Sequence, residues 1–314
     1  MTWRFEPGEP LAAAFARVAA EEIEIVRKKL RRRGRDPGAA IHAARQSFKR
    51  IRALLRLARP TLGEDFSAEN RRYRDAGRLL AGSREAIVLA ETFDKMAADC
   101  SETLSPKDAG LLRAHCIAEV HANGKADIDR RVAQVLAVVD EGENRLSELH
   151  WPADSKELFQ GLRASQTHLR SWYDKAVGTN SAGALHEWRK RVKDQSAQLR
   201  LLRELMPLAY RRMRDQEAKV AELLGLEHDL WMLKRALGAA KVPRKTVPAR
   251  DALAQEIRTQ RHALREQALN SGRKFSSVSP KDFARDLTVS CLGGTGTKLR
   301  RPRSKPQRKM RASR

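Results

Sequence analysis

The chain has 314 residues, with 63 Lys and Arg against 39 Asp and Glu, which gives a formal net charge of +24. That length allows two ordinary domains or one large duplicated domain, and so strong a positive charge favours a polyanionic partner. Three widely spaced cysteines argue against a disulfide framework, and no apolar run is long enough to predict a signal peptide or a membrane span. We therefore expect a cytoplasmic protein.

Almost every segment repeats its apolar residues at the period of an α-helix, and Leu, Ala, Arg and Glu dominate. The pattern predicts an all-α fold with helices at residues 10–33, 39–59, 66–98, 107–149 (with a candidate break near Gly124), 155–177, 183–206, 208–238 and 249–271. Residues 272–314 carry scattered Ser, Gly and Pro and then a basic run, so we expect a basic and mostly disordered tail there, apart from a short candidate helix at 280–287.

One stretch of the sequence occurs twice, 144 positions apart: residues 41–49 read IHAARQSFK and residues 185–193 read LHEWRKRVK. Aligning them without a gap pairs His42 with His186, Arg45 with Arg189 and Lys49 with Lys193. The repeat predicts two pseudo-symmetric four-helix bundles, residues 9–150 and 151–271, each with its histidine helix in second place.

Basic residues gather on one face of each histidine helix. On a helical wheel the first set spans an arc of about 80° and consists of His42, Arg45, Lys49, Arg52 and Arg56. The second set is His186, Arg189, Lys193 and Arg200, which Ser196 interrupts. Neighbouring basic candidates are Lys190, Arg71, Arg74, Arg78, Arg211 and Arg214. A solvated face usually mixes charges, whereas residues 41–59 hold six Lys or Arg and no acid, so we expect an anion to bind here.

The length of the first set indicates the shape of the anion. From His42 to Arg56 the row is about 21 Å long at the helical rise of about 1.5 Å per residue, much longer than one phosphate group. Arginine forks bind phosphate oxygens and lysines act as point charges. The sequence therefore predicts a rod-like polyanion, with both histidines donating hydrogen bonds to it and strengthening binding as the pH falls from about 8 to 6.

At these residues the chain resembles the CHAD family, α-helical proteins named for their histidines and known for binding inorganic polyphosphate. The resemblance covers about residues 9–271 and rests on a histidine that opens a helix, followed at family-like spacing by basic residues. His42, Arg45, Lys49 and Arg52 fit this pattern in the first copy, and His186, Arg189 and Lys193 fit it in the second. The resemblance implies two four-helix bundles around a basic central channel and a binding role, for which targeting to polyphosphate granules is one use.

Other functions have weaker support in the sequence. No nucleophile, acid–base pair or cofactor motif stands out, so we expect neither catalysis nor a cofactor. The nearest metal candidate is His115, Cys116 and His121, whose histidines fall about 120° apart on a helix, which argues against a metal site. Nonspecific binding of nucleic acid, in part through the basic tail, remains the alternative, although few aromatic residues are available to stack on bases.

Overall fold

The computed structural model describes residues 3–34, 36–80, 82–118 and 125–291. Every regular element within these ranges is a helix, which confirms the all-α fold expected from the sequence. No helix there combines the length and the apolar composition that crossing a membrane requires.

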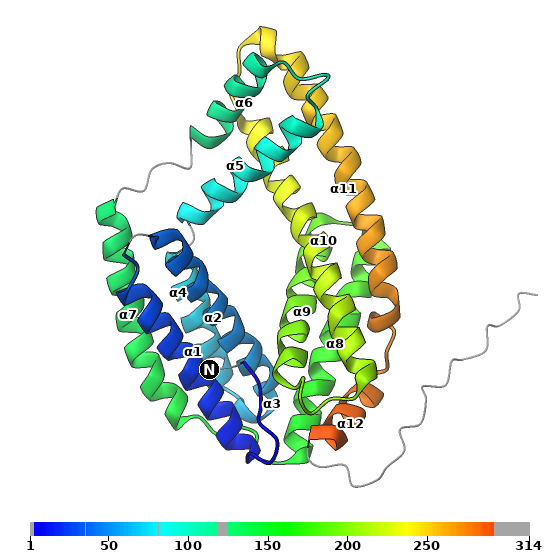
Figure 1. The fold of residues 1–314 in the computed structure, drawn as a ribbon. Helices are drawn as coiled ribbons and strands as arrows, with labels where there is room; N and C mark the ends of the chain where they lie inside the picture. Colours follow the sequence, from blue (N-terminus) through cyan, green and yellow to red (C-terminus); the bar gives the residue numbers. More distant parts are fainter. Residues whose placement is uncertain (1–2, 35, 81, 119–124, 292–314) are drawn as a thin grey trace, which may run out of the picture.

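Figure 1 shows the helices and their labels in chain order. Their bounds are α1 Leu11–Arg31, α2 Pro37–Leu57, α3 Arg59–Leu62, α4 Asp65–Leu79, α5 Gly82–Asp99, α6 Pro106–Ala118, α7 Lys125–Glu148, α8 Ser155–Thr179, α9 Ala182–Leu201, α10 Leu208–Ala239, the short 3-10 helix η1 Arg244–Thr246, α11 Val247–Ser276 and α12 Pro280–Cys291. The predicted helices at 10–33, 155–177 and 208–238 agree with α1, α8 and α10 to within two residues.

The helix predicted at 66–98 is instead two helices, α4 and α5. The helix α4 ends at Leu79, and α5 begins at Gly82 and Ser83, which are poor helix formers. The matching positions in the second copy are Leu226 and Glu227, and α10 continues through them. The break allows α5 to leave the direction of α4, as Figure 1 shows. The region predicted as helical at 107–149 also contains two helices, α6 and α7, which lie on either side of the candidate break near Gly124.

The beginning of the expected tail is folded. The helix α11 runs on to Ser276, and α12 follows it and packs against α8. Phe283, Ala284 and Leu287 of α12 are fully buried, so their apolar surface holds this segment on the domain. The candidate helix at 280–287 is thus part of α12, and the prediction of disorder is wrong for the rest of residues 272–291. Residues 292–314 lie outside the described part of the chain.

Side-chain caps fix where the two histidine helices begin. Asp36 accepts a hydrogen bond from the backbone N–H of Ala39 at the start of α2, and Ser181 accepts one from Ala184 at the start of α9. Asn180, in the left-handed conformation with φ 45°, ends α8 directly before that second cap. Both histidines consequently lie in the second turn of a helix whose first residue is set by a cap.

The buried side chains form two clusters that do not follow the expected halves. The larger cluster joins residues of α1, α2, α4 and α7 to residues of α8, α9, α10 and α12. The smaller one contains Leu89 and Phe93 of α5 and Leu112 of α6, together with Leu233 of α10 and Ile257 of α11. The helices α5 and α6 thus pack on α10 and α11, and the expected grouping of four consecutive helices into each bundle is not confirmed.

The two histidine helices contact one another within the larger cluster. Gln198 of α9 donates a hydrogen bond from Nε2 to the carbonyl oxygen of Ala53 in α2, at 3.0 Å. Gly161 of α8 lies so close to the end of α2 that a Cβ atom there would overlap the carbonyl oxygen of Leu57. A glycine at 161, with no Cβ atom, is therefore required for α8 and α2 to approach each other this closely.

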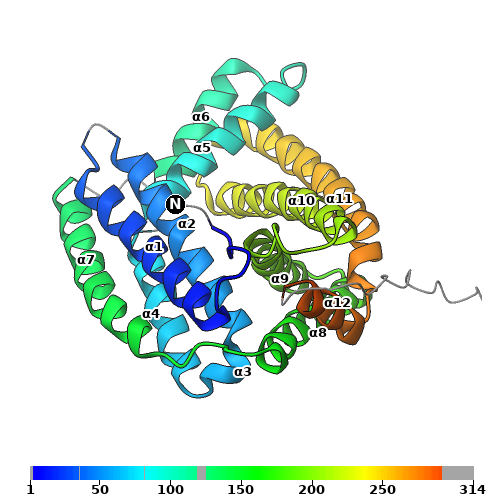
Figure 2. The same ribbon diagram turned by 60° about the horizontal axis from the view of Figure 1, so that its bottom comes forward.

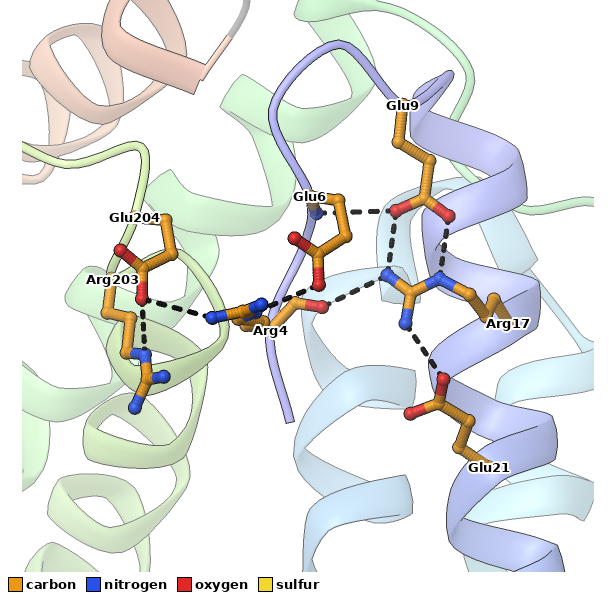
Figure 3. A network of polar contacts seen from close by, with 7 residues as sticks. All are labelled: Arg4, Glu6, Glu9, Arg17, Glu21, Arg203 and Glu204. Carbon is orange, nitrogen blue, oxygen red and sulfur yellow. Dashed lines mark hydrogen bonds and ion pairs between the residues drawn. The ribbon is translucent and has the colours of Figure 1, made fainter. Parts of the chain in front are cut away.

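An N-terminal strap, residues 3–9, also connects the two sides of the molecule (Figure 2). Trp3 donates a hydrogen bond to the carbonyl oxygen of Ala197 at 2.8 Å, and the backbone N–H of Phe5 donates one to Leu201 at 2.9 Å. Figure 3 shows the ion pairs that accompany these bonds. Arg17 of α1 pairs with Glu9 at 2.7 Å, and Arg4 pairs with Glu6 and, at 3.7 Å, with Glu204 beyond the end of α9. The strap thus joins α1 to the end of α9.

Candidate anion-binding site

The structure confirms that the basic face of α2 borders the core. Ile41, Phe48 and Leu55 are buried, while Lys49 is exposed and Arg52 is half-buried. We call the face formed by His42, Arg45, Lys49, Arg52 and Arg56 the α2 row. Because core residues flank it, the row is held on a rigid helix face and needs no ordering when an anion arrives.

Contacts from α4 orient the middle of the α2 row. Arg45 donates a hydrogen bond from Nη1 to the carbonyl oxygen of Gly77 at 2.8 Å, and Arg52 donates one from Nε to Asn70 Oδ1 at 3.1 Å. Burial lowers the pKa of Arg52 to about 10, and repulsion from Arg56 and Arg74 adds to this effect. Arg52 stays charged at neutral pH, in a place that carries excess positive charge.

Asp194 of α9 neutralises the C-terminal end of the α2 row. Arg56 donates a hydrogen bond from Nη1 to Asp194 Oδ1 of α9 at 3.0 Å. Arg191 also lies beside this carboxylate, with 3.5 Å between its Nη1 and Asp194 Oδ2. Arg56 is therefore a weaker candidate for anion contact than the sequence suggested, because its guanidinium is already paired.

The α9 row, which consists of His186, Arg189, Lys193 and Arg200, lies beside its own buried residues Leu185, Trp188 and Val192. Ser196 is buried, which explains why the basic spacing is interrupted there. Lys190 is exposed and pairs with Glu187 at 2.6 Å. Burial lowers the pKa of Arg200, and repulsion from Arg50 and Arg214 adds to this effect. Arg200 therefore lies near a second group of cations, which includes Arg50 and Arg214.

The two rows meet at Lys193. Burial lowers the pKa of Lys193 to about 8, and the charges of Arg189 on the same helix and of Lys49 on α2 lower it further, while Asp229 opposes them. A lysine loses affinity for its proton in this way when cations collect around it without enough acid. Lys49 and Lys193 are matched positions of the sequence repeat, and the charge of one acts on the other between α2 and α9.

Arg189 is the most enclosed cation at this point. Its pKa is lowered by burial and raised in part by Asp229 and Glu227. Its Nε atom is buried and has no hydrogen-bond partner among the described residues. Its guanidinium packs against Gly225 of α10, where a Cβ would lie in ordinary van der Waals contact, 3.6 Å from Arg189 Nη2. Arg189 therefore has a donor available for a ligand oxygen.

The basic residues of α4 and α10 are arranged differently. Arg74 and Arg78 both pair with Asp75, at 2.8 and 3.4 Å, and Arg214 pairs with Asp215 at 2.6 Å. The remaining two, Arg71 and Arg211, are exposed. Arg74 lies near enough to Arg52 to lower its pKa, and Arg214 has the same effect on Arg200. The helices α4 and α10 thus add positive charge beside the two rows, and acids on the same helices neutralise part of it.

Two residues of α10, His228 and Trp231, lie beside the α9 row and were not predicted as site residues. The ring of His228 lies 4.8 Å from the ring of His186 between centroids, and it stacks on Trp231 at 5.6 Å with an interplanar angle of 18°. Burial, with repulsion from Arg189 and His186, lowers the pKa of His228 to about 4. The sequence feature that could have indicated His228 is the pair His228-Asp229, which matches Arg84-Glu85 of the first copy. The side chains of Arg84 and Glu85 lie outside the described part of the structure.

No group of three or more His, Cys, Asp or Glu side chains is placed to hold a metal ion within the described ranges. His121, part of the metal candidate weighed from the sequence, lies outside them. Cys100 and Cys116 are buried thiols, and burial raises the pKa of Cys116 to about 11. That thiol is thus protonated at neutral pH and unsuited to nucleophilic or metal chemistry.

A comparison with models of known protein families matches residues 11–238 to the CHAD domain. No curated protein matches the chain. The matched residues run from the first turn of α1 to the end of α10, and so include both histidine helices and the place where their rows meet. The chain thus belongs to the CHAD domain family.

Proposed function

We propose that this protein binds inorganic polyphosphate through the α2 and α9 rows. The observation that carries the proposal is the meeting of Lys49, Arg189 and Lys193, where mutual repulsion and burial lower the pKa of Lys193 to about 8. An arrangement of this kind is costly without an anion, and a bound polyanion removes the cost. Membership of the CHAD family supports the same ligand.

The dimensions of the rows favour a slim, linear ligand. The α2 row alone extends for about 21 Å along its helix, enough for several consecutive phosphates of an extended chain. A polyphosphate chain has a charge on every unit and carries no base or sugar, so two rows on neighbouring helices can both contact it. Arginine contributes two-pronged hydrogen bonds and lysine contributes point charge to such a chain.

We place the role in binding and not in catalysis. The acids nearest the rows, Asp194, Asp229 and Glu187, each lie beside cations that their charge offsets. Asp194 is held by its ion pair with Arg56. Burial raises the pKa of Glu187, but the hydrogen bond and charge of Lys190 and the charge of Arg191 bring it below its usual value, so this carboxylate is a poor proton acceptor. Their expected effect is to orient the arginines and lysines that contact the ligand.

Nonspecific binding of nucleic acid is the competing function. Binding of single strands relies on aromatic rings that stack with bases, but Phe48 and Trp188 are fully buried, and the ring of Trp231 is stacked on His228. The discriminating experiment is a titration of the protein with long polyphosphate and with single-stranded DNA, side by side over a salt series. Tighter binding of polyphosphate at about 0.15 M salt supports the proposal, and equal affinities support the alternative.

The proposed cellular site of action is the cytoplasm, on polyphosphate granules. A fluorescent fusion of the protein is expected to coincide with granules stained for polyphosphate, and to become diffuse in cells that make no polyphosphate. A distribution that is the same in both kinds of cell would contradict granule targeting while leaving binding itself to be judged by the titration.

A further inference from the structure

Compensation of positive charge varies along the two rows. Arg56 is paired with Asp194, Arg74 with Asp75 and Lys190 with Glu187. One group, in contrast, contains four side chains able to bind an anion, and none of them forms an ion pair with another side chain in the described part of the chain. We call it the histidine corner, and it comprises His186, Arg189 and Lys193 of α9 and His228 of α10.

Hydrogen-bond donors are also available in the histidine corner. Among the described residues, His186 Nδ1 and Arg189 Nε are buried and have no hydrogen-bond partner. The rings of His186 and His228 lie 4.8 Å apart, and the charges of Arg189 and Lys193 both act on His228. Buried polar atoms are nearly always paired in folded proteins, so unpaired ones on neighbouring side chains point to a ligand that completes them.

The acids next to the corner do not remove this excess of charge. Glu227 of α10 is held by two arginines of α11, Arg261 at 2.7 Å and Arg265 at 2.8 Å. Glu187 is held by Lys190 at 2.6 Å and by Arg191 at 3.7 Å. The charge of Asp229 offsets Arg189 and Lys193 in part. The histidine corner is therefore suited to a ligand group with more than one negative charge.

We propose that the histidine corner binds the terminal phosphate of a linear polyphosphate chain, while the α2 row binds internal phosphates. The inference rests on the proposed function and specifies which part of the ligand goes where. An internal phosphate carries one charge and two non-bridging oxygens. A terminal phosphate has three non-bridging oxygens and a second ionisation with a pKa of about 6, so it carries nearly two charges at neutral pH. The corner brings the unpaired donors of His186 and Arg189 together with the charges of Arg189 and Lys193, which suits the additional oxygen and the second charge of a terminal phosphate.

The end of an inorganic chain and the end of a nucleoside triphosphate share this chemistry. A nucleoside triphosphate would also need a place for its base, and Trp231 is the nearest aromatic ring to the corner. Its ring is stacked on His228, and the guanidinium carbon of Arg235 lies 5.9 Å from the ring centroid. Because neighbours already occupy the indole, the proposal commits to the inorganic chain.

The test compares linear tripolyphosphate with a cyclic metaphosphate of matched charge, which has no terminal phosphate, by calorimetric titration of the full chain. The expected result is binding of the linear compound about tenfold more tightly. His228→Phe keeps a ring between His186 and Trp231 but removes the donor, and should reduce this preference to about twofold or less. Lys234→Gln, six residues further along α10, is the control and should retain the preference.

Long chains provide a second measurement. At equal total phosphate, a preparation of shorter chains contains more ends and should saturate the protein at a lower phosphate concentration. If linear and cyclic compounds bind equally while long polyphosphate still binds, end recognition is wrong and the proposed function stands. If no phosphate compound binds, both fail. A preference that survives His228→Phe would exclude the histidine corner, and ATP binding as tightly as tripolyphosphate would overturn the assignment to an inorganic chain.

Discussion

Arg56 of α2 and Asp194 of α9 form an ion pair, with 3.0 Å between Nη1 and Oδ1 and with each side chain only 16% exposed. The two residues belong to different copies of the sequence repeat, so the pair links the two histidine helices. Arg191 approaches the same carboxylate from α9 itself. Burial raises the pKa of Asp194, and the neighbouring arginines, Arg56 first, oppose that rise.

Removing the acid from this pair should destabilise the fold. Asp194→Ala leaves Arg56 and Arg191 in a half-buried position without their partner, which is expected to lower the free energy of unfolding by about 3 kcal/mol. Urea unfolding followed by circular dichroism measures it. Asp215→Ala removes an exposed acid from its pair with Arg214 and should cost less than about 1 kcal/mol. Similar losses in the two variants would show that the link between the helices is not important for stability.

Reversing charge in the two rows should abolish most of the affinity for polyphosphate. Arg45→Glu combined with Arg189→Glu removes two forks and adds two repulsive carboxylates, so we expect a loss of about 3–5 kcal/mol in binding free energy. The measurement is a titration with long polyphosphate at about 0.15 M salt. Arg130→Glu combined with Arg258→Glu changes the net charge by the same amount at two exposed positions and is the matched control. Circular dichroism verifies helicity in each variant.

Truncation separates the rows from the basic C-terminal segment. Residues 298–314 contain nine Lys or Arg and no acid. Their removal should mainly reduce the slope of log affinity against log salt, because fewer counterions are then released on binding. Loss of polyphosphate binding on truncation, together with its retention in the folded double reversal, would assign the site to this segment and not to α2 and α9.

The affinity for polyphosphate should fall as the pH rises from about 7 to 9, because Lys193 loses its charge in that window. Its pKa is lowered to about 8, so the free ammonium is mostly charged at the lower pH and mostly neutral at the higher one. The ligand binds the charged form more tightly while its own phosphates stay ionised, and the expected loss is about threefold to tenfold. Isothermal titration calorimetry at three pH values measures it.

Lys193→Arg tests the origin of that pH dependence. A guanidinium keeps its proton throughout this range, so the variant should bind equally well at about pH 7 and 9. An unchanged fall in the variant would assign the effect to another group. Burial lowers the pKa of both His186 and His228, the latter to about 4. These two histidines therefore gain a proton, and add affinity for the polyanion, at a lower pH than an exposed histidine would. The strengthening expected between pH 8 and 6 is therefore shifted downward for these two.

Gly161→Ala should destabilise the protein through the contact of α8 with α2. The new methyl group would overlap the carbonyl oxygen of Leu57, and the helices would have to move apart at a cost of about 2–3 kcal/mol. Gly178→Ala, in the same helix, meets nothing within 4 Å and should be neutral or stabilising by about 0.5–1 kcal/mol. Thermal unfolding of the two variants gives the comparison, and equal stabilities would contradict the close approach.

Glu217 of α10 is fully buried, and neither of its carboxylate oxygens has a hydrogen-bond partner among the described residues. Burial raises its pKa well above the usual value. The folded state therefore holds this proton more tightly than the unfolded state, and the protein loses stability as the pH rises from about 4 through the folded pKa. Glu217→Gln should increase stability at about pH 7 by roughly 2 kcal/mol and have little effect near pH 4. Calorimetric unfolding at both pH values tests it, and a variant less stable at neutral pH would contradict it.

Local patterns predicted the helices well but not how they group. The periodicity of α1, α8 and α10 identified them nearly to the residue, since apolar spacing, caps and breakers lie within each segment. The packing of α5 on α10 depends on contacts between residues such as Phe93 and Leu233, which are far apart in sequence. The apolar residues of α5 are equally suited to a bundle with α1 and α2, and nothing local reveals the direction that the chain takes after α4.

The candidate site shows the same limit. The matched rows identified Lys49, Arg189 and Lys193, because equal residues at equal spacing occupy equal positions in a repeat. The neutralisation of Arg56 was not predictable, since Asp194 comes from another helix. His228 was also missed as a contact of His186, because ring-to-ring approach depends on how α9 crosses α10. Sequence spacing therefore indicates which face carries charge, and tertiary contacts decide which of those charges remain available.

The packing of α5 and α6 on α10 and α11 has a consequence for synthesis on the ribosome. Leu112 of α6 is made about 120 residues before Leu230, which shares its buried cluster. At about 5–20 residues per second, the apolar faces of α5 and α6 wait roughly ten seconds for a partner. The nascent chain thus passes through a stage at which about half of it is complete and one of its cores cannot yet form. Stalled translation at that stage would leave an aggregation-prone hairpin for chaperones to cover.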